Sequence, residues 1–163
     1  MSATAPTRVA SGTSAITWRF AHFDQLTPGE LYEILQLRTA VFVMEQNCVF
    51  QDMDGADPKC WHLSGIQDGH IVAYCRLVPA GVKYAEPSIG RVITPLATRG
   101  TGLGRELMRE ALAHAQRLWP GQALRIGAQA HLQRFYGEFG FTKASEPYDE
   151  DGILHVEMVL AAG

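Results

Sequence analysis

Three glycines alternate with other residues between a predicted strand and a predicted helix, in the sequence Arg99-Gly100-Thr101-Gly102-Leu103-Gly104. The start of a helix exposes unpaired N–H groups at the positive end of the helix dipole, so it favours an anion. Glycine lets an anion approach the backbone because it has no Cβ, and Arg99 and Arg105 add positive charge. The loop therefore predicts a phosphate site.

Two familiar phosphate-binding loops do not match this segment. A Walker loop needs Gly-Lys-Ser/Thr, whereas Gly104 is followed by Arg105-Glu106. A dinucleotide-binding loop needs a small residue where Arg105 stands and a carboxylate about 20 residues later, where the sequence has Ala123-Leu124-Arg125. The phosphate must therefore belong to another class of ligand.

The charge distribution supports an anionic ligand at one place in the chain. The net charge is −3, but residues 91–125 contain six arginines and two acids, so this segment is +4 and the rest is −7. An alternative is a solvated helix face with ordinary arginines. Nucleic-acid binding is disfavoured because the segment lacks interleaved aromatic residues and the whole chain is acidic.

A second hypothesis concerns the acidic residues: they form a rim that attracts a cationic amine. The alternative is that they are ordinary solvated loop charges. The residues are Asp52, Asp54, Asp57, Glu146, Asp149, Glu150 and Asp151.

Hydrophobic periodicity and turn residues predict a single α/β domain with a mixed sheet over residues 16–163, after a disordered tail at 1–15. Thr27 caps a helix and Glu30 completes a capping box. Asp68-Gly69 predicts a hairpin. The predicted strands are 16–23, 61–67, 71–78, 88–94, 123–128, 140–144 and 153–160, with helices from Thr27, at 103–118 and at 131–138, and a loop at 46–59.

The composition argues for an ordinary cytoplasmic protein. No apolar run approaches the roughly 20 residues that span a bilayer, and no secretory signal peptide is evident. Cys48, Cys60 and Cys75 are odd in number and widely spaced, which favours reduced thiols over disulfides. No pair of cysteines or histidines has the spacing of a metal site. We expect no metal, no membrane and no nucleic-acid partner.

A strand, an Arg-x-x-Gly-x-Gly loop and a Phe-Tyr-x-x-x-Gly-Phe segment follow one another in order: Arg91–Thr94, Arg99–Gly104 and Phe135–Phe141. This arrangement resembles the GNAT (Gcn5-related N-acetyltransferase) superfamily over nearly the whole chain from Trp18 onward. A closer resemblance is to its ElaA-like branch, carried by Arg38–Gln46, Asp54-Gly55-x-Asp57, Trp61-His62-Leu63, Tyr74-x-Arg76-Leu77 and Ile89–Val92. Some of these residues are also similar to the acyl-homoserine lactone synthases.

The resemblance implies a GNAT-like fold and acetyl-CoA as co-substrate. It implies that the strand at Val92, Ile93 and Thr94 pairs with the pantetheine arm. It also implies that the loop residues hold the pyrophosphate: Arg99, Gly100, Thr101, Gly102, Leu103, Gly104 and Arg105. Tyr136 would protonate the departing sulfur; its alternative role is a core aromatic beside Phe135.

The base that deprotonates the amine is less well defined by the sequence. Glu45, His62, His131 and His155 are the titratable candidates, with Glu45 and His131 ranked first. Many relatives carry a carboxylate where this chain has Ile89-Gly90-Arg91, so its absence favours proton relay through water.

The function that these residues imply is an N-acetyltransferase that moves an acetyl group directly to a primary amine of a small molecule or peptide. Two alternatives stay open: a non-catalytic acyl-CoA-binding module, and an acyl-homoserine lactone-type synthase with longer acyl donors. A homodimer is possible, since dimers are common in such folds.

Overall fold

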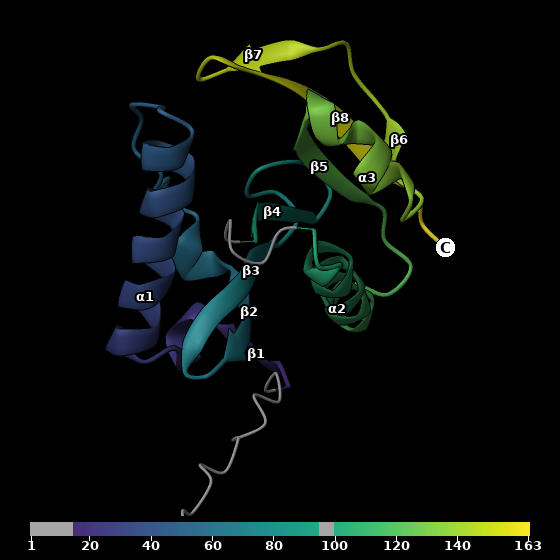
Figure 1. Cartoon of the computed structure of the whole chain (residues 1–163). Coiled ribbons are helices and arrows are strands. Elements are labelled where there is room, and N and C mark those ends of the chain that lie inside the picture. Colours follow the sequence, from purple (N-terminus) through teal and green to yellow (C-terminus); the bar gives the residue numbers. More distant parts are fainter. Residues whose placement is uncertain (1–14, 95–99) are drawn as a thin grey trace, which may run out of the picture.

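The computed structural model describes residues 15–94 and 100–163, in which the strands form two antiparallel sheets (Figure 1). The first has the order β1-β2-β3-β4, with β1 Thr17–His22, β2 Trp61–Gln67, β3 His70–Val78 and β4 Ser88–Ile93. The second has the order β5-β8-β6, with β5 Leu124–Gln129, β8 Ile153–Leu160 and β6 Thr142–Lys143, and β7 Tyr148–Glu150 also pairs with β8. The predicted single α/β domain is confirmed. In the described residues its strands form two antiparallel sheets in place of one mixed sheet.

The helix α1 (Pro28–Arg38) begins as the sequence predicts. The Thr27 hydroxyl accepts from the Glu30 N–H, and the Glu30 carboxylate accepts from the Thr27 N–H. The helix then widens into a π-helix, η2 (Thr39–Glu45), where the Gln46 N–H donates to the Val41 carbonyl at 3.2 Å. Apolar spacing predicts helix here but cannot distinguish this wider turn, which in proteins often marks a functional site.

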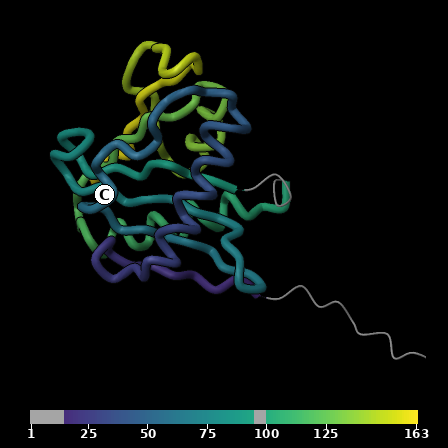
Figure 2. The backbone as a smooth tube through the Cα atoms, turned by 90° about the vertical axis from the view of Figure 1, so that its left-hand side faces the viewer, coloured from purple at the N-terminus to yellow at the C-terminus, as the bar shows by residue number. Residues whose placement is uncertain are grey.

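Two helices cover opposite faces of the first sheet. Because side chains alternate along a strand, Tyr74 and Arg76 of β3 face α1, and Cys75 and Leu77 face α2 (Leu103–Leu118). Figure 2 shows α1 crossing in front of the strands of the first sheet. The main core lies around α2, where Leu107, Met108, Ala111 and Ala115 pack against both sheets. This packing fixes where α2 begins, and therefore where its N-terminus points.

The C-terminal part of the chain carries one element that the sequence did not predict. The predicted helix at 131–138 is split into a 3-10 turn, η5 (Ala130–Leu132), and α3 (Gln133–Gly137). The short strand β7, absent from the prediction, pairs with β8 as a hairpin that extends toward the end of η2 (Figure 1). There the Cys48 thiol donates to the Asp151 carbonyl at 3.2 Å.

The described residues also contain two short 3-10 helices, η1 (Phe23–Gln25) and η3 (Asp57–Lys59). All three cysteines are free, as predicted, and all three are buried. The predicted tail falls almost wholly outside the described residues, as does the segment 95–99 with Arg99.

Candidate active site

A cavity of about 970 Å³ opens between the two sheets, where β4 and β5 separate. The Arg125 N–H of β5 donates to the Pro87 carbonyl just before β4, at 3.0 Å. Beyond this contact, no ladder joins β4 to β5 in the described part of the chain. The cavity therefore lies between two strands whose facing edges are not paired with each other.

A β-bulge shapes the β4 side of the cavity. Tyr74 pairs with Ile93 and Arg76 with Gly90, so Arg91 and Val92 together oppose Cys75. Arg91 has a left-handed backbone with φ of 51°, an unfavourable conformation for a residue with a side chain. Its guanidinium donates to Oδ1 of Asp52 at 2.8 Å and to the Asp52 carbonyl at 3.0 Å. These bonds hold the bulge, which redirects the end of β4 into the cavity.

The glycine loop lies at one end of the cavity. Gly100 and Gly102 have φ of 81° and 85°, where a larger residue would be strained. Gly102 is the N-cap of α2. Because glycine has no side chain, it makes no side-chain hydrogen bond to the first N–H groups of the helix. Arg105 forms a bidentate pair with Glu138, at 2.9 and 3.2 Å. This end has the features of an anion site.

Most of the residues predicted to hold the donor line this cavity. They are Val92, Ile93, Thr94, Gly100, Gly102, Gly104 and Arg105. The side chain of Leu103 is buried in the core instead, so only its backbone is available to a ligand. Thr101 lies in the loop beside the lining glycines, and Arg99 falls outside the described residues.

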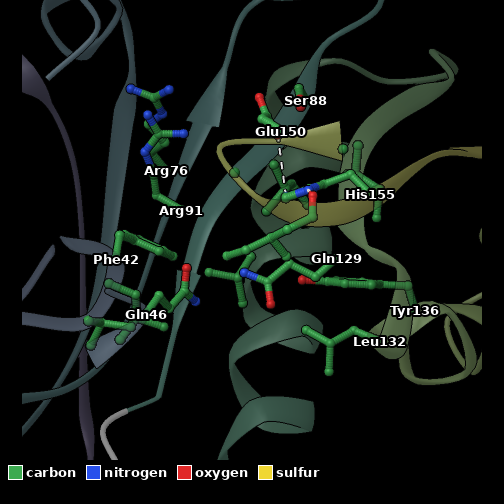
Figure 3. Close-up of a pocket in the computed structure, with 18 of the residues that line it drawn as sticks. Phe42, Gln46, Arg76, Ser88, Arg91, Gln129, Leu132, Tyr136, Glu150 and His155 are labelled. Atoms are coloured by element: carbon green, nitrogen blue, oxygen red, sulfur yellow. Dashed lines mark hydrogen bonds and ion pairs between the residues drawn. The ribbon is translucent and has the colours of Figure 1, made fainter. Parts of the chain in front are cut away.

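Tyr136 projects from α3 into the middle of the cavity (Figure 3). The residue is only 7% exposed, and its ring packs edge-on against Phe135 and Phe141. Burial raises the pKa of the Tyr136 hydroxyl well above its usual value. The hydroxyl is therefore protonated at neutral pH.

The structure separates the four predicted base candidates. Glu45 of η2 and His131 of η5 line the cavity with exposed side chains. His155 of β8 also lines it, but is buried. His62 lies elsewhere: Nδ1 is 2.7 Å from the Tyr74 hydroxyl and Nε2 is 3.1 Å from the Asp57 carbonyl. Burial lowers the pKa of His62, which is a structural residue of the β2–β3 hairpin.

A buried ion network lies behind the β4 wall, and it corrects the acidic-rim hypothesis. Arg38 contacts Asp52 and Asp57, each at 2.7 Å, and Arg76 contacts Asp57 at 2.9 Å and Asp54 at 2.6 Å. Burial alone would raise the pKa of Asp57, but its hydrogen bonds to the two arginines outweigh this and lower it. Asp52 and Asp57 are therefore internal partners of arginines, and the rim interpretation is wrong for them.

Three of the proposed rim residues line the cavity. Asp54 does so while paired with Arg76, and Glu150 and Asp151 do so at the tip of the β7–β8 hairpin, whereas Glu146 and Asp149 lie outside it. Glu150 lies 3.3 Å from Nε2 of His155 (Figure 3). The sequence ranked His155 low because nothing in it indicates that β7 folds back to place a carboxylate beside this histidine.

Residues 15–94 and 100–163 contain neither a candidate metal site nor a helix that could span a membrane. No group of three or more His, Cys, Asp or Glu side chains there could hold a metal ion. None of the helices found there has both the length and the apolar character to cross a bilayer.

A sequence model of the acetyltransferase (GNAT) domain matches residues 32–162. A UPF0039 protein of Synechocystis is 45% identical over 89% of this chain and 95% of its own length. The protein ElaA of Escherichia coli is 43% identical over 88% of this chain and 95% of its own.

Solved structures agree with these sequence comparisons. An acyl-CoA N-acyltransferase from Pseudomonas aeruginosa has a TM-score of 0.86 and 44% identity, covering 90% of this chain and all of that one. The crystal structure of Escherichia coli ElaA has a TM-score of 0.84 and 42% identity, covering 88% of this chain and 98% of that one. Both the order of the elements and the sequence are therefore shared over the same region.

Proposed function

The chain belongs to the GNAT acetyltransferase family, and from this membership we propose that it transfers the acetyl group of acetyl-CoA to a primary amine. Enzymes of this family use acyl-CoA donors and amine acceptors. The observation that carries the proposal is the cavity between β4 and β5, which is lined by the glycine loop at the start of α2, by the buried Tyr136 and by the carboxylates of Glu150 and Asp151.

The residues at the glycine-loop end fit a CoA diphosphate. Gly100 and Gly102 adopt the left-handed backbone that the loop requires, and a Cβ added at either would meet no atom within 4 Å, so space is left for a ligand. The N–H groups of Leu103, Gly104 and Arg105 form the first turn of α2 and favour negative charge. Arg99 and Thr101 complete the predicted set.

The edge of β4 fits the extended pantetheine arm. Val92 in the bulge and Ile93 and Thr94 beyond it line the cavity, and this edge faces β5 without a ladder in the described residues. We propose that its backbone groups pair with the amides of the arm and that one N–H polarises the thioester carbonyl. Pro95, the next residue, has no N–H to offer.

Tyr136 is the proposed proton donor to the departing sulfur. Its hydroxyl is protonated at neutral pH. The thiolate that leaves when the C–S bond breaks has an ordinary pKa near ~8.5 and is stabilised by a hydrogen-bond or proton donor.

We infer direct transfer between two bound substrates. Cys60 and Cys75 do not line the cavity, which argues against an acyl-cysteine route through either of them. Cys48 does line it, and its thiol donates to the Asp151 carbonyl at 3.2 Å; direct transfer predicts that Cys48→Ala keeps its activity. Glu45 and His131 remain the predicted candidates for the base that deprotonates the acceptor amine.

The test is a thiol-release assay with acetyl-CoA and a panel of polyamines, amino acids and peptide N-termini. We expect amine-dependent release, and Tyr136→Phe should lower kcat on the order of 10²-fold, a usual contribution of general acid catalysis, with the KM for acetyl-CoA unchanged. Tyr32→Phe is the matched control, because Tyr32 is 72% exposed on α1.

Two results would replace this proposal. Tight acetyl-CoA binding without thiol release for any amine would identify a non-catalytic binding module. Faster turnover of octanoyl-CoA than of acetyl-CoA would identify a synthase for longer acyl groups.

A further inference from the structure

His155 and Glu150 form a histidine–carboxylate pair on the cavity wall. His155 lies on β8, directly opposite Tyr148 of β7 and Gln129 of β5 in the two ladders. Its Nε2 is 3.3 Å from Oε2 of Glu150, and both residues line the cavity. Figure 3 shows this pair and Tyr136 on the same side of the cavity, with Gln129 between them.

The backbone fixes which nitrogen of His155 can act as a base. Nδ1 lies 2.7 Å from the carbonyl oxygen of Ile153. A carbonyl only accepts hydrogen bonds, so Nδ1 carries the hydrogen in this contact. In the neutral ring the lone pair is therefore on Nε2, the nitrogen that faces Glu150. This arrangement of one bonded and one basic nitrogen is the one expected of a histidine that accepts a proton.

The two members of the pair differ in how firmly they are held. The His155 side chain is 11% exposed and stacks on the ring of Tyr148, with centroids 5.9 Å apart. The Glu150 side chain is 58% exposed, so it can adjust to a ligand at little cost. Gln129 presents a neutral amide from β5, and the side chain of Tyr84 is hydrogen-bonded to that of Tyr148.

We propose that Glu150 and His155 bind the ammonium form of the acceptor amine and that Nε2 of His155 removes its proton. A neutral imidazole next to a carboxylate leaves two acceptors 3.3 Å apart, and an ammonium group supplies donors to both. This inference rests on the proposed function and names the charge state of its acceptor: a primary amine that enters as a cation.

The protons balance over one turnover. One N–H bond of the ammonium breaks and an Nε2–H bond forms, which leaves a neutral amine to attack the thioester carbon. The resulting imidazolium pairs with Glu150 and releases its proton to solvent. As the C–S bond breaks, Tyr136 gives its proton to sulfur, and it regains one from the newly acylated nitrogen. The products are the amide, the free thiol and one proton.

The binding step can be tested without turnover. Butylammonium is titrated into the CoA-saturated protein while the side-chain ¹⁵N resonances of its histidines are recorded by NMR. We expect the Nε2 resonance of His155 to shift with saturation, and that of His70, an exposed residue outside the cavity, to stay in place. A shift of His131 without one of His155 would overturn the proposal.

The catalytic step is tested by kinetics on the amine that the wild type acetylates fastest. His155→Gln should lower kcat by 10²- to 10⁴-fold, the usual range for a general base, with the KM for acetyl-CoA unchanged. Glu150→Gln should raise the KM for the amine about tenfold. Glu146→Gln is the matched control, because Glu146 is exposed and outside the cavity.

Two outcomes separate this inference from the proposed function. If the wild type releases no thiol with any amine but butylammonium still shifts His155, the proposed function fails and the ammonium site stands. If the wild type is active and His155→Gln, melting at the wild-type temperature, retains its kcat, the ammonium site fails and the proposed function stands. Loss of activity in His131→Gln or Glu45→Gln, with His155→Gln active, would assign the base to one of those residues instead.

Discussion

The two walls of the cavity hold their charges in different ways. On the wall of α1, β3, β4 and the loop before β2, Arg38 and Arg76 are 0% and 2% exposed, and each contacts two aspartates. On the wall of β5, β7, β8, α3 and the first turn of α2, the charged side chains of Arg105, Glu138 and Glu150 are 42–58% exposed, and each pairs with one partner. Arg125 of β5, which pairs with Glu86 and Glu157, is also partly exposed, at 25%.

This difference separates scaffolding from chemistry. A buried charge that loses its partner costs several kcal/mol. Each arginine of the first wall is therefore needed to neutralise the buried aspartates that it contacts. Exposed pairs contribute little to stability, and the second wall is held by apolar side chains such as Ile126, Val156 and Met158. Its charges can therefore serve binding and proton transfer, and this is the wall on which we place the ammonium site.

Removing an arginine from the first wall should give the largest effect. Arg38→Met leaves Asp52 and Asp57 with one arginine each, and we expect it to cost about 3–5 kcal/mol in the free energy of unfolding. Arg105→Met, which breaks an exposed pair, should leave the urea midpoint unchanged within error. Equal losses in the two variants would show that the walls do not differ.

Acid should unfold the protein through the first wall. The pKa values of Asp54 and Asp57 are lowered in the folded state, so their contribution is present above the ordinary carboxyl pKa near ~3.9 and is lost as the pH falls below it. The pKa of His62 is also lowered, so the unfolded chain binds its proton first and stability declines below about pH 6.5.

Urea unfolding between pH 7.5 and pH 3 measures this decline. His62→Gln removes the titrating group, so its stability should change less than that of the wild type between pH 6.5 and pH 5. Identical slopes for the two proteins over this range would contradict the assignment to His62.

Features encoded within a few consecutive residues could be predicted from the sequence. The capping box of Thr27 and Glu30, the Asp68-Gly69 hairpin and the glycine loop each depend on neighbours at fixed spacing. The helix α2 also follows from hydrophobic periodicity, because a single buried face repeats along it. The strands β2 and β3 are buried on both faces and follow instead from short apolar runs bounded by turn residues.

Features assembled from distant segments could not be predicted. Arg91 and Asp52 are 39 residues apart in sequence, and only the packing of the loop before β2 against β4 brings them together. The aspartates of that loop have the composition of a solvated turn, and tertiary burial decides otherwise. Likewise, β7 has only three residues, which are too few to show an alternating pattern. Without β7, the sequence does not predict that Glu150 lies beside His155.

Arg91 offers a finer comparison within the first wall. Arg91→Ala and Arg91→Gly both lose the bonds to Asp52, but only glycine accepts φ of 51° without strain. We expect the glycine variant to be more stable than the alanine variant by about 1 kcal/mol, the cost of a left-handed residue with a Cβ. Urea unfolding gives the difference directly. The reverse order would mean that the bulge relaxes once the side chain is gone.

Lys83 lies at the exposed edge of the same network and should have the smallest effect. Its ammonium is 3.1 Å from Asp54, but the side chain is 41% exposed. We expect Lys83→Gln to cost less than about 1 kcal/mol and to cost nothing measurable in 1 M NaCl, where the screening length is about 3 Å. The loss caused by Arg38→Met should persist in the same salt, because salt does not reach a buried pair. Unfolding of both variants at 0.05 M and 1 M NaCl makes the test. If Lys83→Gln lowered the free energy of unfolding as much as Arg38→Met at both concentrations, exposed and buried ion pairs would contribute equally to stability. Burial would then not be the difference between the two walls.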